Sequence, residues 1–150
     1  MISTECGKGC NVYIFREMTM SDYQGAFSLW AGTDGMGIGE SDTEENIARF
    51  LNRNPGHSFV CEHNGAIVGT VLCGHDGRRG FLYHVAVSSA HRGQGIANTL
   101  LSKALDSLSA IGISKCHLMV LKTNRLGAEF WEYNGWQRRE DIFIYSKSLK

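Results

Sequence analysis

The hydrophobic and polar positions of this chain follow the period of strands in some segments and of helices in others. Residues 12–17 alternate apolar and polar side chains, which predicts a half-buried strand. Asn64-Gly65 separates two apolar runs, and this dipeptide favours a type I′ hairpin turn. The further predicted strands are residues 58–63, 66–74, 81–87, 114–121, 136–139 and 142–147.

Helical spacing appears in four segments. Ser21-x-x-Gln24 and Ser41-x-x-Glu44 both fit a capping box, so each predicts the start of a helix. After residue 95, apolar side chains recur every four residues up to position 108, which indicates an amphipathic helix on a sheet. A short last helix is expected over residues 126–133, before the C-cap signal Asn134-Gly135.

The order of these elements is β-α-α-β-β-β-α-β-α-β-β, which predicts an α/β fold with a mixed, mostly antiparallel sheet flanked by helices. Residues 66–74 and 81–87 are almost wholly apolar, as in strands that are covered on both faces. No repeat or linker interrupts residues 12–150, and we expect them to form a single domain.

Composition narrows the function only slightly. The chain has 150 residues, of which 43% are hydrophobic, and its formal net charge is +0. This balanced charge does not indicate binding to nucleic acid or to an anionic membrane. No secretory signal is visible. Cys6 and Cys10 lie in a leader, residues 1–11, that we expect to be disordered, with free thiols in a reducing cytoplasm. The remaining cysteines, Cys61, Cys73 and Cys116, fall in apolar strands and are expected in the core.

The segment with the clearest chemistry is Arg92-Gly-Gln-Gly-Ile-Ala97, between a predicted strand and a predicted helix. Its glycines allow a tight turn and a close approach of a ligand to the backbone. The first amides of the helix have no partner within the helix and attract an anion, typically a phosphate. A tight turn without any ligand is the alternative.

Three kinds of phosphate loop can be compared with this segment. A Walker loop needs a lysine followed by Ser or Thr, but Ile96-Ala97 stands there. A dinucleotide fingerprint needs a third glycine where Asn98 stands. The pattern Arg/Gln-x-x-Gly-x-Gly/Ala fits at every position, and it resembles the pyrophosphate-binding motif of the GCN5-related N-acetyltransferases (GNAT).

The resemblance covers residues 12–149 element for element. The chain looks most like small bacterial members that carry Gly69-Thr-Val71 followed by the Gly-His-Asp-Gly-Arg-Arg-Gly of residues 74–80. It implies an N-acetyltransferase that moves the acetyl group of acetyl-CoA to a primary amine of a small molecule or a protein N-terminus. A non-catalytic acyl-CoA sensor and an interaction module on the same fold remain as alternatives.

The resemblance also implies where acetyl-CoA binds. Val85 and Val87 offer main-chain hydrogen bonds to the pantetheine arm, and the N–H of Val85 polarises the acetyl carbonyl. Asn124 contacts the pantetheine in the family, although Asn is equally suited to cap the following helix. Trp131 stands where relatives often carry the tyrosine that protonates the leaving thiolate, so it is expected as a cofactor wall. The amides of the loop complete the expected set, with Arg92, Gly93, Gln94, Gly95, Ile96 and Ala97.

Acceptor and base are the least defined parts of the expected site. His84 is the best candidate for the base, because an imidazole titrates near neutral pH, with a histidine held by hydrogen bonds in the sheet as the alternative. Its neighbour Tyr83 is expected on the other face of the strand. Asp34 and Asp76 could hold a cationic acceptor, and otherwise they are solvated loop charges. No spacing suggests a metal, and a monomer or homodimer in the cytoplasm is expected.

Overall fold

The computed structural model describes residues 12–150, so the expected leader with Cys6 and Cys10 lies outside the described residues. The chain forms two compact units, which divide between Met119 and Val120. That residues 12–150 act as a single domain stays a prediction. Within the described part, no helix is long and apolar enough to cross a bilayer.

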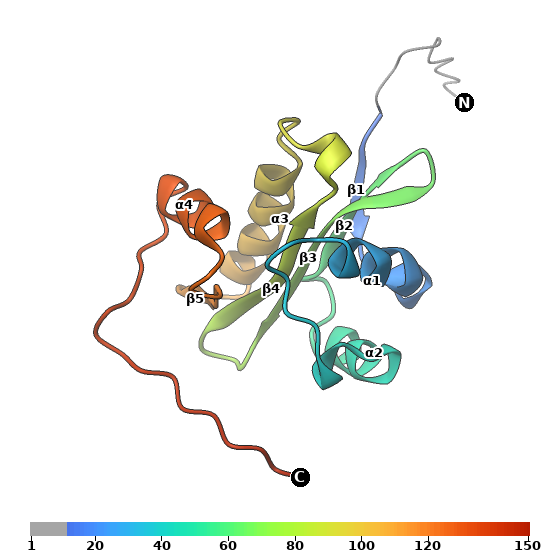
Figure 1. Ribbon diagram of the computed structural model, residues 1–150. Helices are drawn as coiled ribbons and strands as arrows, with labels where there is room; N and C mark the ends of the chain where they lie inside the picture. Colours follow the sequence, from blue (N-terminus) through green and yellow to red (C-terminus); the bar gives the residue numbers. More distant parts are fainter. Residues whose placement is uncertain (1–11) are drawn as a thin grey trace. The chain divides into compact units, whose positions relative to one another are not determined.

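The first unit is built on a sheet whose strands lie in chain order, β1-β2-β3-β4-β5 (Figure 1). Neighbours from β1 to β4 pair antiparallel, and β5 pairs parallel to β4. The predicted mixed, mostly antiparallel sheet is therefore confirmed. The strands are β1 (Ile14–Glu17), β2 (Phe59–His63), β3 (Ala66–His75), β4 (Gly80–Val87) and β5 (Cys116–Leu118).

The hairpin between β2 and β3 turns as its sequence predicts. Asn64 has φ 51° and Gly65 has φ 80°, so both central residues adopt the left-handed conformation that a type I′ turn requires. This turn sets the pairing of His63 with Ala66 and of Glu62 with Ile67, beyond which the register shifts between Cys61 and Glu62.

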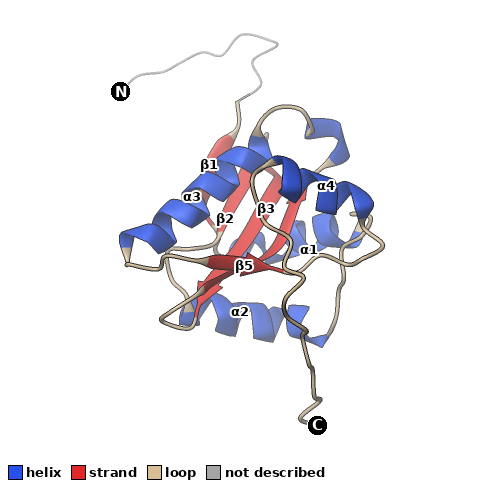
Figure 2. Ribbon diagram, turned by 90° about the vertical axis from the view of Figure 1, so that its left-hand side faces the viewer, coloured by secondary structure: helices blue, strands red, loops and turns tan. Residues whose placement is uncertain are grey.

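Helices cover both faces of the sheet (Figures 1 and 2). On one face, α1 (Tyr23–Ala31) and α2 (Glu44–Arg53) pack their buried Trp30 and Ile47 against strand residues that include Leu72. On the other face lies α3 (Ile96–Ala110). The remaining helix, α4 (Arg125–Tyr133), belongs to the second unit.

The first two helices begin differently from their predicted caps. Short 3-10 turns precede them, η1 (Met20–Asp22) and η2 (Glu40–Asp42). Each turn is closed by a buried aspartate: Asp22 accepts from the N–H of Thr19 and Asp42 from that of Gly39, both at 2.9 Å. The carboxylates therefore close the two 3-10 turns, and α2 itself is capped by Thr43, whose hydroxyl accepts from the N–H of Asn46 at 3.3 Å, and not by Ser41.

Two glycines allow α3 to lie close to the sheet. A Cβ on Gly69 would stand 2.8 Å from Ile96 Cγ2, and one on Gly80 would stand 2.4 Å from Leu108 Cδ1. Ile96 and Leu108 are both 2% exposed. Because these contacts lie at the two ends of α3, they fix where the helix begins over the sheet.

The C-terminal part differs from its predicted strands. The strand expected over residues 114–121 is only three residues long, Cys116–Leu118, and residues 136–150 carry no strand. Phe143 is 88% exposed and Tyr145 91%. Alternating apolar residues form a strand only where one face is buried and the backbone finds a ladder, and this segment has neither within the described residues.

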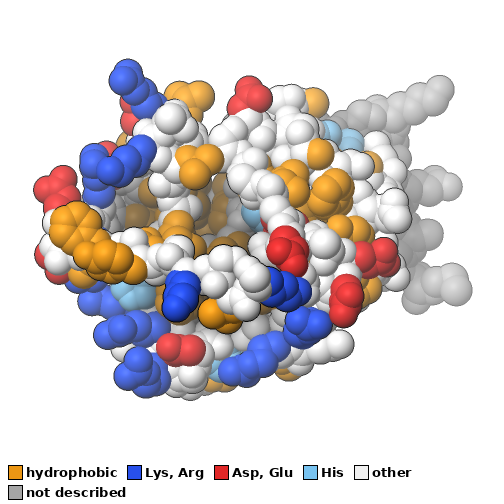
Figure 3. Space-filling model, turned by 60° about the horizontal axis from the view of Figure 1, so that its bottom comes forward, with side chains coloured by type: hydrophobic (Ala, Val, Ile, Leu, Met, Phe, Trp, Pro, Cys, Tyr) orange, Lys and Arg blue, Asp and Glu red, His pale blue; other side chains and the backbone are white. Residues whose placement is uncertain are grey.

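Charged side chains of both signs are scattered over the face shown in Figure 3. This distribution agrees with the net charge of +0.

His57 is a buried histidine beneath α3. It is 7% exposed, its Nδ1 lies 2.7 Å from Ser107 Oγ, and its ring centroid is 5.2 Å from that of His75. Burial lowers the pKa of His57, His75 lowers it further, and Glu17 opposes the change. The imidazole is therefore neutral in the folded protein at neutral pH.

We expect the free energy of unfolding to fall as the pH drops below the ordinary histidine value of 6.5, because the unfolded imidazole then binds a proton that buried His57 resists. Above pH 6.5 the contribution of neutral His57 to the free energy of unfolding is fully present. Denaturant unfolding between about pH 7.5 and about pH 5.5 should show a smaller loss for His57→Gln than for the wild type or His117→Gln. Identical losses in all three would contradict the assignment.

Candidate active site

The glycine loop between β4 and α3 has the backbone conformation that its sequence predicts. Gly93 has φ 77°, and Gly95, the N-cap of α3, has φ 76°. A Cβ at either position would meet nothing within 4 Å, so backbone conformation and not crowding by the protein requires glycine here. The loop therefore leaves open space in front of the first amides of a fifteen-residue helix.

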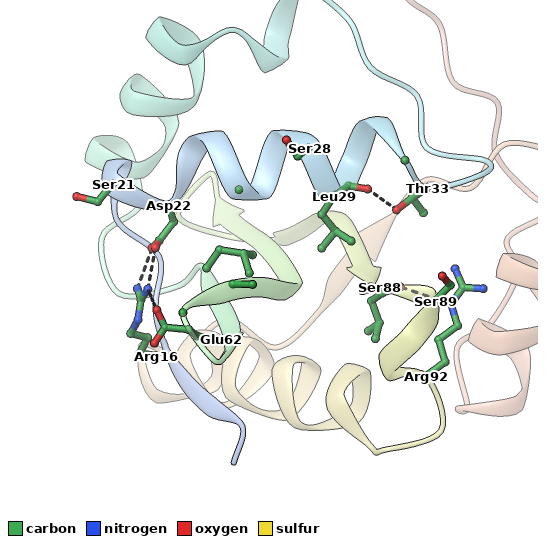
Figure 4. A pocket seen from close by; sticks show the side chains of 16 residues that line it. Arg16, Ser21, Asp22, Ser28, Leu29, Thr33, Glu62, Ser88, Ser89 and Arg92 are labelled. Atoms are coloured by element: carbon green, nitrogen blue, oxygen red, sulfur yellow. Dashed lines mark hydrogen bonds and ion pairs between the residues drawn. The ribbon is translucent and has the colours of Figure 1, made fainter. Parts of the chain in front are cut away.

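A pocket of about 770 Å³ opens beside this loop and runs along α1 (Figure 4). At one end lie the side chains of Ser88, Ser89 and Arg92, and the Arg92 guanidinium donates to the Val87 carbonyl at 3.4 Å. The pocket thus supplies hydroxyls and one positive charge next to the loop.

The other end of the pocket is closed by an ion pair. Arg16 donates to both carboxylate oxygens of Asp22, at 2.8 and 2.7 Å, and to Glu62 at 3.4 Å. These contacts hold the pKa of Asp22 below its ordinary value. Figure 4 shows the three side chains gathered away from Arg92, so the two ends of the pocket carry separate charges.

A β-bulge interrupts β4 at His84 and Val85. On β3 and β4, Thr70 faces Ala86 and Leu72 faces Tyr83, so two residues of β4 stand opposite one of β3. His84 has φ 48°, a conformation that is rare outside glycine. Its carbonyl accepts a 2.7 Å hydrogen bond from Thr70 Oγ1, which in turn accepts from Trp30 Nε1 at 2.9 Å.

The bulge changes the direction of two side chains. The His84 ring lies 4.5 Å from that of Trp30 on α1, and the Tyr83 ring lies 6.0 Å from that of Phe50 on α2. Both therefore face the α1 and α2 side of the sheet, and the expectation that Tyr83 points to the opposite face is wrong. Strict alternation fails here because the extra residue resets the period of the strand.

The His84 imidazole is held on both nitrogens. Its Nε2 lies 2.6 Å from Asp42 Oδ1, and its Nδ1 lies 2.9 Å from Met36 Sδ. The side chains of His84 and Asp42 are only 12% and 8% exposed. A carboxylate and a thioether sulfur can both only accept, so the two contacts are both hydrogen bonds when each ring nitrogen carries a proton, and Nδ1 can present a lone pair to another molecule once Met36 has moved away.

The edge of β4 beyond the bulge is open toward β5. The two strands pair only from Gly80 to Leu82, opposite Cys116 to Leu118. Val85 and Val87 therefore lie on a stretch of β4 without a partner strand on that side among the described residues. Main-chain groups on such an edge are available to an extended, peptide-like ligand.

In the second unit, Asn124 caps α4. Its Oδ1 accepts from Gly127 N at 2.9 Å, and a Cβ on Gly127 would stand 2.6 Å from the Asn124 side chain. The capping role is thus confirmed, and a role toward a cofactor stays a prediction. Trp131 packs edge-on against Phe130 and Trp136, with ring centroids 5.1 Å apart in both pairs.

The two aspartates predicted to bind an acceptor lie in different surroundings. Asp34 is exposed in the loop that carries Met36. Asp76 Oδ1 accepts from the N–H groups of Arg78 and Arg79, both at 2.8 Å, so it stabilises the hairpin turn between β3 and β4. The hydrogen bond from the Arg79 N–H has the largest effect on the pKa of Asp76, followed by that from the Arg78 N–H, and both lower it.

Other reactive side chains offer little to this site. Cys61 and Cys73 are buried as expected, and burial raises the pKa of their thiols to about 11 and about 12. Cys116 is only partly buried. Among residues 12–150, no three side chains of His, Cys, Asp or Glu gather as a metal site would need.

The sequence did not point to Asp42. It lies 42 residues before His84, within a stretch read only as a helix start. The sequence indicates only that Asp42 precedes a helix, where a carboxylate commonly accepts hydrogen bonds from backbone amides. Nothing in the spacing shows that its second oxygen reaches a histidine on a strand.

Comparisons with known proteins identify the family and the fold of this chain. A curated acetyltransferase of Pectobacterium atrosepticum is 41% identical over 113 residues, which cover 75% of this chain and 77% of that protein. The fold is similar to Ard1 of Thermoplasma volcanium, with a TM-score of 0.72 at 17% identity, covering 82% of this chain and 81% of that one.

A second similar structure is the diaminobutyrate acetyltransferase of Paenibacillus lautus, in complex with L-2,4-diaminobutyric acid and coenzyme A. Its TM-score is 0.69 at 23% identity, covering 83% of this chain and 75% of that one. The sequence profile described as Acetyltransferase (GNAT) family matches residues 16–136, most of the chain. The chain therefore belongs to the GNAT acetyltransferase family.

Proposed function

We propose that this protein transfers the acetyl group of acetyl-CoA to a primary amine of a small molecule or a protein N-terminus. The observation that carries the proposal is the His84–Asp42 pair beside the bulge of β4. The proposed base, His84, directly precedes Val85, whose backbone N–H is the proposed donor to the acetyl carbonyl. Acyl transfer to an amine needs a base for the amine proton and a donor for the carbonyl oxygen.

Acetyl-CoA binding rests on the loop and the open edge of β4. The amides of Gly93 to Ala97 receive the pyrophosphate, and Arg92 adds charge. The pantetheine arm follows β4, where Val85 and Val87 bind it through the main chain. The family resemblance adds Asn124 and Trp131 to the residues proposed to contact the cofactor. In support, the related fold from Paenibacillus lautus holds coenzyme A.

In the proposed reaction, the amine nitrogen attacks the thioester carbonyl, whose oxygen gains negative charge and is stabilised by the Val85 N–H. The ammonium proton passes to Nδ1 of His84. Asp42 keeps the imidazole in the correct tautomer and stabilises the imidazolium that forms. The C–S bond then breaks and coenzyme A leaves.

Nδ1 of His84 is covered by Met36 before the acceptor arrives, at 2.9 Å from its sulfur. Met36 lies in the loop between α1 and η2, where Gly35 has φ 79° and Gly37 and Gly39 are free of contacts within 4 Å at a built Cβ. We propose that this loop moves to admit the acceptor. Asp34 on the same loop then favours a cationic amine, while Asp76 remains the weaker candidate.

The leaving thiolate has no tyrosine donor at position 131. An indole N–H is far too weak an acid to protonate it, so the proton comes from water or coenzyme A leaves as the thiolate. Because position 131 lacks the tyrosine, a non-catalytic acyl-CoA sensor remains the second candidate function. Such a sensor must bind acyl-CoA but does not need a group that protonates the leaving thiolate.

A panel of amines with acetyl-CoA, followed by the appearance of free thiol, tests the proposal. Polyamines, amino acids, aminoglycosides and N-terminal peptides are the classes to include. Thiol release with at least one amine supports transfer. Binding of acetyl-CoA without release points to the sensor, and no thermal stabilisation by acetyl-CoA points to an interaction module.

Gly95→Val should weaken acetyl-CoA binding far more than Arg92→Ala, because a branched side chain resists φ 76° and fills the space of the phosphate. Gly77→Val is the matched control, with φ 93° and no Cβ contact in a distant turn. Calorimetric titration with acetyl-CoA measures the affinity. Equal affinity of Gly95→Val and the wild type would exclude the loop as the phosphate site.

His84→Gln should lower kcat by about 100-fold or more with acetyl-CoA affinity unchanged, the scale of general base catalysis. Asp42→Asn should lower kcat as well and move the pH profile of kcat/KM, because it no longer stabilises the imidazolium. His75→Gln is the control, on β3 and outside the site. Turnover within a few-fold of wild type for both His84→Gln and Asp42→Asn would rule out this base.

Trp131→Phe should keep most of the turnover, because Trp131 is proposed to pack and not to donate a proton. Steady-state kinetics with the accepted amine measure kcat and KM. A loss of about 100-fold in kcat with unchanged KM would assign Trp131 a role in acid–base chemistry.

A further inference from the structure

His84 holds a backbone conformation that a histidine rarely adopts. Its φ is 48°, and apart from Asn64 in the hairpin turn it is the one non-glycine residue with positive φ among residues 12–150. A backbone in such a conformation persists only where its surroundings determine it, and these positions gather at functional sites. The groups that hold the backbone at His84 therefore bear on the proposed reaction.

A buried hydroxyl holds this backbone. Thr70 is 0% exposed, and its Oγ1 donates to the His84 carbonyl at 2.7 Å. An indole N–H can only donate, so the 2.9 Å contact of Trp30 Nε1 with Thr70 Oγ1 makes the hydroxyl oxygen an acceptor there. The single proton of the hydroxyl is left for the His84 carbonyl, and Trp30 thereby fixes the direction in which Thr70 donates.

The peptide bond between His84 and Val85 carries this constraint to the proposed carbonyl donor. The His84 C=O and the Val85 N–H belong to one planar unit, and because the bond is trans they point in opposite directions. A hydrogen bond that fixes the carbonyl therefore also fixes the N–H, which is directed away from Thr70. A donor to a developing oxyanion is effective only when it points at the oxygen in advance.

We propose that Thr70, oriented by Trp30, is a positioning residue that aims the backbone N–H of Val85 at the acetyl carbonyl. This inference rests on the proposed acetyl transfer. It gives a role to Gly69-Thr-Val71, the segment by which the chain resembles small bacterial members of the family. Thr70 touches no substrate itself, because it is fully buried, and acts through the peptide plane between His84 and Val85.

A second buried hydroxyl in the same sheet provides a matched comparison. Ser58 is 2% exposed and directly precedes β2. Its Oγ accepts from the N–H of Cys73 at 3.0 Å and donates to the Cys73 carbonyl at 3.4 Å. Both contacts lie on β3 and not on β4. Loss of this hydroxyl should lower the free energy of unfolding without turning the peptide plane at His84.

Steady-state kinetics with the accepted amine form the first test. Thr70→Val keeps the shape of the side chain, so kcat and kcat/KM should both fall by about 100-fold, the effect of a misplacement of about 1 Å at a reacting centre. Thr70→Ser keeps the hydroxyl and should recover most of kcat. Ser58→Ala should lower stability but keep the wild-type kcat. Wild-type turnover in Thr70→Val, or equal losses in Thr70→Val and Ser58→Ala, would overturn the inference.

Proton NMR of the Val85 amide tests the same inference without turnover. In the wild type and in Thr70→Ser, this proton should lie further downfield with acetyl-CoA than with free coenzyme A, which lacks the acetyl carbonyl. In Thr70→Val the difference should vanish. No difference in the wild type, or an unchanged difference in Thr70→Val, would contradict the positioning role.

The two measurements separate the inference from the proposed function. If no amine releases thiol but the Val85 difference depends on the Thr70 hydroxyl, the transfer reaction is wrong and the positioning stands. If thiol is released and the difference does not depend on Thr70, the positioning alone is wrong. Should Thr70→Val fail to fold, Trp30→Phe replaces it with smaller losses expected, and wild-type values in both measurements would then overturn the inference.

Discussion

One buried hydroxyl holds the candidate active site in place. Thr70 is fully buried, accepts a hydrogen bond from the indole of Trp30 and donates one to the carbonyl of His84. The bulge in β4 depends on that carbonyl being satisfied away from the ladder, since a buried carbonyl without a partner costs about 1–3 kcal/mol. Through the bulge, Thr70 determines where the His84 ring points and where the strand edge at Val85 begins.

The opposite face of the sheet determines the position of the glycine loop. Gly69 and Gly80 leave room for Ile96 and Leu108, so α3 lies close to β3 and β4 with its first turn fixed. The bulge acts from one side of β4 and α3 from the other. The proposed carbonyl donor and the proposed phosphate loop are therefore held by neighbouring parts of one rigid sheet, and their spacing does not depend on flexible loops.

Local patterns in the sequence were sufficient for the features that depend on neighbouring residues. The Asn64-Gly65 turn and the αL glycines of the loop follow from backbone conformations that few residues adopt. The same patterns could not show the bulge, because a bulge depends on the register of two strands. For this reason strict alternation puts Tyr83 on the wrong face, and no local pattern shows that His84 pairs with Asp42.

The strands predicted over residues 136–139 and 142–147 are absent for a different reason. Residues 142–147 have the composition of a strand, but a strand exists only where another backbone pairs with it. Segments of this kind depend on tertiary context, which composition does not contain.

The contact between Met36 and His84 has a consequence for chemical selectivity. In the proposed mechanism, Nδ1 of His84 lies against the thioether of Met36, a weak hydrogen-bond acceptor, until an acceptor amine arrives. While Met36 occupies this position, Nδ1 is engaged and does not activate a water molecule against the thioester. The resting protein would thus protect a bound acyl donor from wasteful hydrolysis until an acceptor displaces the methionine.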